Sequence, residues 1–371
     1  MHQPAKLGFV DRLRGIAILM VIAMHYLQVF ASPVVRDWNE IGQIGVQLLF
    51  VVSAFTLCLS ADNRRDEPQR LWAYAVRRYF RIAPVYYVGI LFYWWLFTAS
   101  GEGAPYTLRN VLANVFLVHG LVPEANNNVV PGGWTIATEV LFYAAFPLLY
   151  PLLEAAWKRW GNRALTGAFA LSLIVAIGWQ LNFHATYGKW LPNNGFAYGS
   201  FVNQLPVFVA GMAWYLAAWR GGGFTPRPGR DLALAAVFFA ACWLILGLEL
   251  IPFGGILPSL AAIAWVLFGN VLRGQGAEGG WLGQIGRVSY SLYLIHFAMV
   301  WRPSAWLLAS VADVPYAQLA LMVPLYVLEV ALLYPIARLV WRFVEQPGNR
   351  LGQAVIDWSA KHRKTAVSTP G

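Results

Sequence analysis

The sequence predicts an all-α polytopic membrane protein with about ten transmembrane helices and both termini in the cytoplasm. Of its 371 residues, 58% are hydrophobic and only 12% are charged, and the mean hydropathy is +0.53. A water-soluble domain of this length does not carry so apolar a composition. The second observation is the length of the apolar stretches, because about 20 helical residues cross a hydrocarbon core of roughly 30 Å.

Apolar stretches of that length recur along the whole chain. They occupy residues 13–32, 42–60, 82–99, 134–153, 164–181, 200–219, 232–249, 256–272, 288–308 and 318–341. An even number of spans places both termini on one side of the membrane. We expect the protein in the inner (cytoplasmic) membrane of the cell, with the lipid bilayer as its surroundings.

The distribution of basic residues supports this topology. With cytoplasmic termini, all but four of the 27 Lys and Arg fall in cytoplasmic ends and loops; the exceptions are Arg36, Arg109, Lys189 and Arg302. Basic residues are enriched in the cytoplasmic loops of membrane proteins. The formal net charge of +10 therefore indicates membrane topology rather than a nucleic-acid partner.

The chain contains no evident internal repeat, so residues 1–350 are expected to form one transmembrane domain, followed by a short basic cytoplasmic tail at 351–371. The first apolar run resembles a signal peptide but is longer than a typical one, and we expect it to be retained. Cys58 and Cys242 lie inside expected spans. The sequence therefore predicts neither a disulfide framework nor a bound metal.

Two polar residues of the first span stand out. Arg14 and His25 are eleven residues apart, a spacing that turns a helix through about 1100° and separates the two positions by about 16 Å along one face. Ionisable residues are costly within a membrane and often mark a functional path. We interpret Arg14 and His25 as the two ends of such a path.

The segment after the second expected span is rich in arginine. Arg77 and Arg78 precede Arg81 by four and three residues, so both are its neighbours on a helix. Guanidinium groups make paired, charge-assisted hydrogen bonds to phosphate oxygens. Positive-inside charge alone could explain this cluster, but together with Arg14 it predicts a ligand with several phosphates.

Glu139 and His25 are both expected in the outer half of the membrane, where a nearby carboxylate would make the histidine a better general base. Either residue could instead hydrogen-bond a neighbouring helix. That structural role is also expected for Glu329 and for His296, which the spans place nearer the inner half. His119 is expected on an outer amphipathic segment that could line an acceptor site.

Several blocks of the chain together resemble the integral membrane acyltransferases of acyltransferase family 3. The blocks are DRLRGIAILMVIAMH, LLFVVSAFTL, RRYFRIAPVYY, GGWTIATEVLFYAAFPLL, IGRVSYSLYLIH and VEQP. Three residues depart from the family pattern: Arg12 and Ala54 stand where glycine is common, and Val140 stands where a second acid follows Glu139 in the family.

The resemblance implies a ten-helix core that transfers an acyl group, usually acetyl, from cytoplasmic coenzyme A to a hydroxyl of a glycan or other acceptor on the far side. It assigns catalysis to His25 and Glu139. It assigns binding of the donor, acetyl-CoA or another acyl-CoA, to a set comprising Arg14, Arg77, Arg78, Arg81 and Glu345. Both a general-base mechanism and an acyl-histidine intermediate are compatible with it.

The alternative function is a secondary transporter or a flippase of a glycan or lipid-linked substrate, which also needs many spans and buried ionisable groups. Transporters often contain paired repeats with interrupted helices in corresponding halves. No such pairing is evident in this sequence. A P-loop, a G-x-S-x-G elbow and an H-E-x-x-H motif are also absent from it, so nucleotide hydrolysis and zinc proteolysis have no support.

Overall fold

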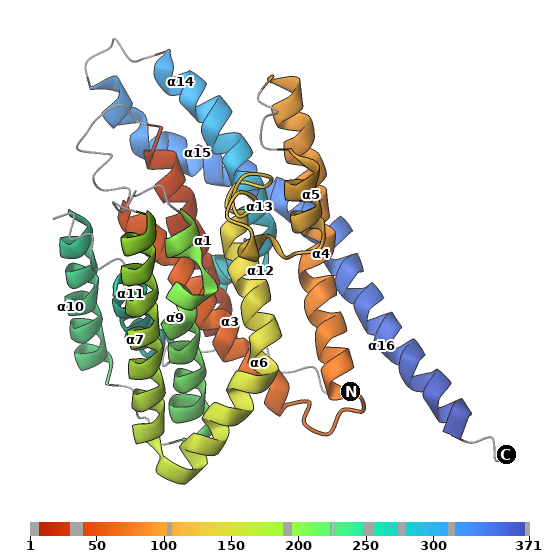
Figure 1. Ribbon diagram of the computed structural model, residues 1–371. Helices are drawn as coiled ribbons and strands as arrows, with labels where there is room; N and C mark the ends of the chain where they lie inside the picture. Colours follow the sequence, from red (N-terminus) through yellow and green to blue (C-terminus); the bar gives the residue numbers. More distant parts are fainter. Residues whose placement is uncertain are drawn as a thin grey trace.

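The computed structural model describes residues 7–29, 40–101, 106–187, 195–222, 225, 227–247, 256–273, 279–310 and 316–367, and this part of the chain is helical throughout, apart from its connections (Figure 1). Its first half contains α1 (Gly8–Leu27), the 3-10 turn η1 (Glu40–Gln43), α3 (Ile44–Asp62), α4 (Arg70–Ala99), α5 (Leu108–Val115), the 3-10 turn η2 (His119–Leu121), α6 (Gly133–Trp160) and α7 (Asn162–Tyr187).

The second half includes three short π-helical segments within longer helices. Its elements are α8 (Gly195–Gly199), α9 (Phe201–Trp214) with η3 (Tyr215–Arg220), α10 (Pro228–Gly247), α11 (Leu257–Arg273), α12 (Gly280–Arg287), α13 (Ser289–Met299) with η5 (Val300–Ser304), α14 (Ala305–Ala309), α15 (Ala317–Val340) with η6 (Trp341–Glu345), and α16 (Gln346–Val367).

The all-helical membrane fold is confirmed, and every expected span overlaps a helix. Among the described residues, seven helices are long and apolar enough to cross a membrane. The other three expected spans fall on α1, which carries three charged residues, on the shorter α11, and on α13 to α14. Residues 30–32 and 248–249 of the expected spans lie outside the described residues.

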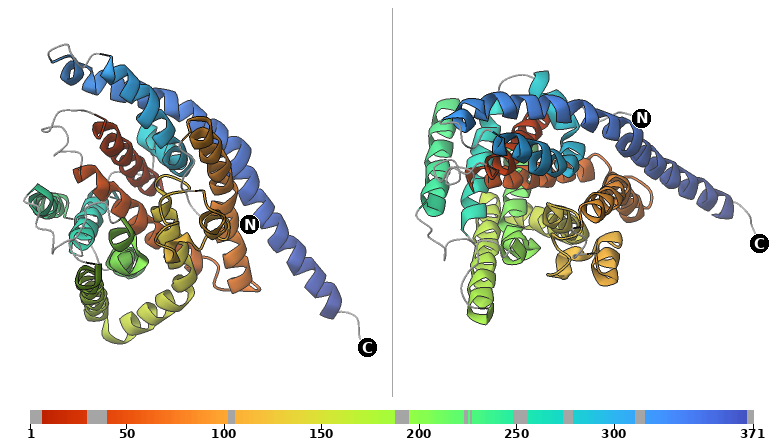
Figure 2. Two further views of the ribbon diagram at one scale, coloured as in Figure 1. Left: turned by 45° about the horizontal axis from the view of Figure 1, so that its top comes forward. Right: turned by 90° about the horizontal axis from the view of Figure 1, so that it is seen from above.

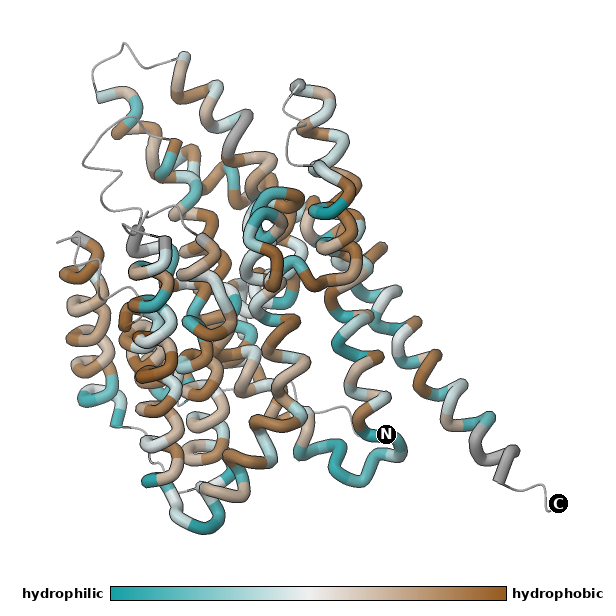
Figure 3. Tube along the Cα trace, in the orientation of Figure 1, coloured by the Kyte–Doolittle hydropathy of each residue, from teal (hydrophilic) through white to brown (hydrophobic). Residues whose placement is uncertain are grey.

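The helices divide into a buried centre and an apolar periphery. Most side chains of α3 and α9 are buried, whereas α7 and α10 expose large apolar residues such as Ile174 and Val237. Hydrophilic residues gather at the connection between α3 and α4 and at the turn between α6 and α7 (Figure 3). An exposed apolar belt between hydrophilic ends is what a lipid environment requires.

Close packing of α1 against α12 positions the first half of α1. A side chain at Gly15 would collide with the backbone of Leu282, and one at Gly286 would collide with the backbone carbonyl of Asp11. Small residues allow two helix backbones to approach in this way. As a result α12 covers the first turns of α1, and α13 begins farther along α1, beside its second half.

Replacing Gly286 with alanine is expected to destabilise the protein by roughly 1–3 kcal/mol, because overpacking forces the two helices apart. Thermal unfolding in detergent measures the effect. Gly283→Ala is the matched control on the same helix, since its added methyl group would meet the Asp11 side chain at 3.6 Å, an ordinary contact. Equal stability of the two variants would contradict this account of the packing.

The last helix continues α15 through η6 and extends away from the bundle as one long oblique rod (Figure 2). Residues 351–367 of the expected basic tail belong to α16, which packs against α4. Gly348 and Gly352 bring its backbone onto Pro84 and Phe80. The basic run at 361–364 therefore begins on the far turns of a helix.

An ion network ties together the helix ends near the connection between α3 and α4. Arg65 lies 2.7 Å from Asp62 and 2.9 Å from Glu154, and Arg220 lies 2.8 Å from Glu154. The hydroxyl of Tyr150 also donates to Asp62 at 2.8 Å. The network fixes the ends of α3, α6 and η3 relative to one another, and two of these helices carry residues of the candidate site.

Candidate active site

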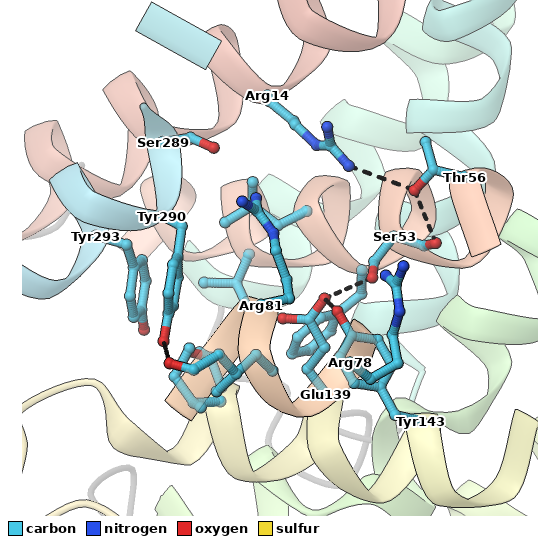
Figure 4. Close-up of a pocket in the computed structure, with 16 residues that line it drawn as sticks. Arg14, Ser53, Thr56, Arg78, Arg81, Glu139, Tyr143, Ser289, Tyr290 and Tyr293 are labelled. Atoms are coloured by element: carbon cyan, nitrogen blue, oxygen red, sulfur yellow. Dashed lines mark hydrogen bonds between the residues drawn. The ribbon is translucent and has the colours of Figure 1, made fainter. Parts of the chain in front are cut away.

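A polar pocket lies where α1, α3, α4, α6 and α13 meet (Figure 4). Three arginines and one carboxylate face it, together with hydroxyl groups from three helices. Its polar lining is Arg14, Ser53, Thr56, Arg78, Arg81, Thr135, Glu139, Tyr143, Ser289, Tyr290 and Tyr293. The structure therefore brings four of the seven expected site residues into one cavity, although they come from three different helices.

Arg14 reaches the pocket from the first half of α1. Its Nη2 donates to the Thr56 hydroxyl at 3.3 Å, and its Nη1 lies 3.9 Å from the Asp11 carboxylate. Thr56 itself donates to the Val52 carbonyl of α3 at 2.9 Å. Within the described part of the chain Arg14 is thus held by one weak bond and one distant carboxylate, which leaves guanidinium N–H groups for a ligand.

Arg78 is held mainly by aromatic rings. Its guanidinium carbon lies 5.5 Å from the Tyr143 ring centroid and 6.0 Å from that of Tyr74. Its buried Nε has no hydrogen-bond partner, and among the described residues no carboxylate forms an ion pair with it. Arg78 also lines a larger, mainly apolar groove of about 860 Å³ between α4 and α6. A guanidinium group that has no ion-pair partner among the described residues and faces both the pocket and the groove is suited to binding an anion.

Arg81 has a carboxylate partner of its own. It forms an ion pair with Glu345 of η6, which also accepts a hydrogen bond from the Ser291 hydroxyl at 2.9 Å. Glu345 is only 1% exposed. It lies behind Arg81 and not among the pocket-lining residues, so its contact with a donor would be indirect, through the arginine that it holds in place.

Glu139 is hydrogen-bonded within the pocket. The hydroxyls of Ser53 and Tyr143 donate to its Oε1 at 2.5 Å and 2.6 Å. The spacing of Glu139 and Tyr143 on α6 is four residues, so they are neighbours on one face. Among the described contacts, none joins Glu139 to His25. The sequence leaves open whether these two residues touch, and the structure places Glu139 beside the arginines of the pocket instead.

His25 instead pairs with a second histidine. Its Nδ1 lies 2.9 Å from the Val21 carbonyl and 3.3 Å from Nε2 of His296, and the two ring centroids are 5.0 Å apart. His296 is fully buried. The sequence places His25 in the outer half and His296 nearer the inner half. Their contact shows that this difference is wrong and that the two residues lie side by side, because α12 packs on the first turns of α1 and α13 on later ones.

The side chain of Tyr293 stands between the pocket and this histidine pair. Tyr293 lines the pocket, and its ring centroid is 5.6 Å from that of His296. The Tyr293 hydroxyl donates to the carbonyl of Gly132 at 2.9 Å. Gly132 adopts a φ of +74°, and a side chain there would collide with Tyr293. In this conformation Tyr293 separates the arginines from His25.

The remaining candidates lie elsewhere. Arg77 forms a paired salt bridge with Glu67 at 2.7 Å and 2.6 Å and does not line the pocket. His119 is fully buried and contacts the Tyr86 hydroxyl at 3.0 Å, so its side chain does not face an open acceptor site in this structure. Glu329 is also buried and accepts a hydrogen bond from Ser304 at 3.0 Å. These contacts agree with structural roles for His119 and Glu329.

Comparison with known proteins identifies the family. The profile of the acyltransferase domain of acyltransferase family 3 matches residues 7–338. The chain belongs to acyltransferase family 3. The exopolysaccharide production protein ExoZ of Rhizobium meliloti (strain 1021) is 28% identical over 273 residues, which cover 69% of this chain and 76% of that protein. The acyltransferase MdmB of Streptomyces mycarofaciens is 26% identical over 329 residues, which cover 80% of this chain and 79% of that protein. No solved structure matches the chain.

Membership of acyltransferase family 3 makes this chain a multi-pass membrane acyltransferase. An acyltransferase requires an acyl donor, and the pocket offers positive charge and hydroxyl groups where a donor could bind. The sequence does not predict that Ser53, Tyr143 and Tyr293 line the pocket, nor that His296 contacts His25. Their only signal in the sequence was polarity within apolar segments, which does not reveal which helices touch.

Proposed function

We propose that this protein transfers an acyl group, in the simplest case acetyl, from cytoplasmic acyl-CoA to a hydroxyl of a cell-surface or exported glycan on the extracytoplasmic side. Both termini would be cytoplasmic, as the distribution of Lys and Arg indicates. The observation that carries the proposal is that an arginine-lined pocket and a histidine pair lie along the same helix, α1.

The charge of the pocket supports acyl-CoA as the donor. Arg14 and Arg78 contribute positive charge that nearby carboxylates do not cancel closely, since Arg14 is 3.9 Å from Asp11 and Arg78 has no ion pair among the described residues. Phosphate groups of coenzyme A are the ligands that such guanidinium groups bind best. Arg81 would complete the donor site, with Glu345 holding it in position.

The distance along α1 supports His25 as the catalytic base. Eleven residues of helix separate it from Arg14, about 16 Å at 1.5 Å per residue. An extended pantetheine arm can bridge such a distance and bring its thioester past Tyr293, which has to move aside. Glu139, with Ser53 and Tyr143, would then flank the path of the arm.

The proposed chemistry is transfer to an acceptor hydroxyl. His25 takes the hydroxyl proton while the acceptor oxygen attacks the thioester carbonyl. A new carbon–oxygen bond forms, the carbon–sulfur bond breaks, and the departing thiolate receives the proton from His25. An acyl-histidine intermediate would use the same nitrogen as nucleophile.

The proposal that the acceptor is a glycan is supported by one relative, ExoZ, whose name refers to exopolysaccharide production. To test the function, the purified protein is placed in lipid nanodiscs with acetyl-CoA, and free coenzyme A thiol is measured with and without exported glycan. Acceptor-dependent thiol release together with acylated glycan is expected. Movement of glycan across the membrane of proteoliposomes that contain the protein, without thiol release, would instead support the transporter or flippase.

Arg78→Ala is expected to raise KM for acyl-CoA about tenfold or more, since a charge-assisted hydrogen bond contributes about 1.5–3 kcal/mol and 1.4 kcal/mol is tenfold. Steady-state kinetics with varied donor measure this. Arg70→Ala is the control, because Arg70 is an exposed arginine at the start of the same helix. Equal KM values for the two variants would remove Arg78 from the donor site.

A further inference from the structure

Two imidazole rings meet inside the bundle, and the function proposed above uses only one of them. His25 projects from α1 and His296 from α13, with 3.3 Å between Nδ1 of His25 and Nε2 of His296. His296 is fully buried, and Phe297 packs against both rings at centroid distances of 4.3 Å and 4.1 Å. The pair is therefore a fixed arrangement within the packing of α1 against α13.

The backbone decides which ring nitrogens carry protons. A carbonyl oxygen only accepts hydrogen bonds, so a ring nitrogen beside one must be the donor. Nδ1 of His296 lies 2.7 Å from the Tyr293 carbonyl, and Nδ1 of His25 lies 2.9 Å from the Val21 carbonyl. In their neutral forms both rings are consequently protonated at Nδ1 and carry a lone pair at Nε2.

This assignment gives the contact between the rings a direction. The Nδ1–H of His25 is shared between the Val21 carbonyl and the lone pair on Nε2 of His296. Nε2 of His25 keeps its own lone pair and has no hydrogen-bond partner among the described residues. The nitrogen that remains available for chemistry is therefore Nε2 of His25.

We infer that His296 is a positioning residue: it orients His25 with Nε2 as the reactive nitrogen and accepts a hydrogen bond that strengthens when His25 becomes protonated. The inference rests on the proposed function, in which His25 is the base. In this role His296 acts on the orientation of His25, in addition to packing between α1 and α13.

The proton balance follows from this geometry. When Nε2 of His25 takes the acceptor's hydroxyl proton, the ring becomes a cation, and its Nδ1–H becomes a charge-assisted donor to His296. The proton stays on His25, because His296 is fully buried and a positive charge on its ring would be shielded from water. The proton returns from Nε2 of His25 to the leaving thiolate, and both rings end neutral.

Three substitutions at His296 separate this role from packing. In His296→Gln the amide oxygen can replace Nε2 as acceptor. In His296→Asn the shorter side chain can replace only the Nδ1 donor to Tyr293, and His296→Phe keeps the ring shape but neither polar group. We expect Asn and Phe to lower kcat about 10- to 100-fold, and Gln to restore most of it. KM for acyl-CoA should stay close to that of the wild type, because His296 does not line the arginine pocket that would bind the phosphates.

The outcomes decide the inference in either direction. Unchanged kcat in all three variants would overturn it, and so would a Gln variant as slow as the Asn variant with unchanged KM. If the Phe variant fails to fold, the comparison of Gln with Asn still decides, because both are polar and differ only in reach.

A second measurement does not depend on activity. Nitrogen-15 spectra of histidine-labelled protein in nanodiscs distinguish protonated from bare ring nitrogens, and they should show His25 protonated at Nδ1 and bare at Nε2. The reverse pattern would overturn the role of His296 even in an active enzyme. The expected pattern in a protein that releases no coenzyme A thiol would instead count against the proposed function alone.

Discussion

Replacing His25 with alanine is expected to reduce acyl transfer by about 10²–10⁴-fold, the usual contribution of a general base. The loss should appear in kcat, whereas KM for acyl-CoA should change little, because His25 does not line the arginine pocket. Release of coenzyme A thiol in nanodiscs measures both parameters. The structural reason is that Nε2 of His25 has no hydrogen-bond partner among the described residues, while the ring is held in place through Nδ1.

His362→Ala is the matched control, since it makes the same chemical change at an exposed histidine of α16. Wild-type turnover in His25→Ala would refute the assignment of the base. The same protein distinguishes the two mechanisms. Labelled acyl-CoA without acceptor should leave no label on the chain if transfer is direct, whereas an acyl-histidine intermediate would leave label on His25 that the alanine variant cannot retain.

The helices were predictable because their signal is local. A membrane imposes one length on each span, so apolar runs reveal helices without knowledge of their neighbours. The spacing of Arg14 and His25 placed both on α1 for the same reason. The end of the chain was harder, because α16 is too polar to read as a span and is a helix that packs on α4.

The contacts of the site were only partly predictable. Arg78 and Arg81 were found through their spacing, but so was Arg77, and the sequence does not show that Glu67 forms an ion pair with it. The pairing of His25 with His296 depends on glycine contacts that set the level of α13 against α1. Such contacts join residues far apart in the chain, so neither periodicity nor local spacing reveals them.

Substitutions at Glu345 can separate an effect on the stability of the fold from an effect on the binding of the acyl donor. Its side chain is fully buried and is paired with Arg81, whose side chain is 32% exposed. Removing one partner of a buried pair leaves an uncompensated charge, so Glu345→Ala is expected to destabilise the protein by roughly 3 kcal/mol. It should also raise KM for acyl-CoA, because Arg81 loses the group that holds it at the pocket wall. Thermal unfolding and donor kinetics measure the two effects.

The double variant Arg81→Met with Glu345→Leu tests the two roles against each other. Apolar replacement of both partners of a buried ion pair is often neutral or stabilising, so the double variant should recover most of the stability lost in Glu345→Ala. Its KM for acyl-CoA should nevertheless stay about tenfold or more above that of the wild type, because a guanidinium group is missing from the donor site. Recovery of both properties would show that Arg81 serves packing alone. Recovery of neither would show that Glu345 supports more than Arg81, with the buried Ser291 hydroxyl as the other partner that loses its acceptor.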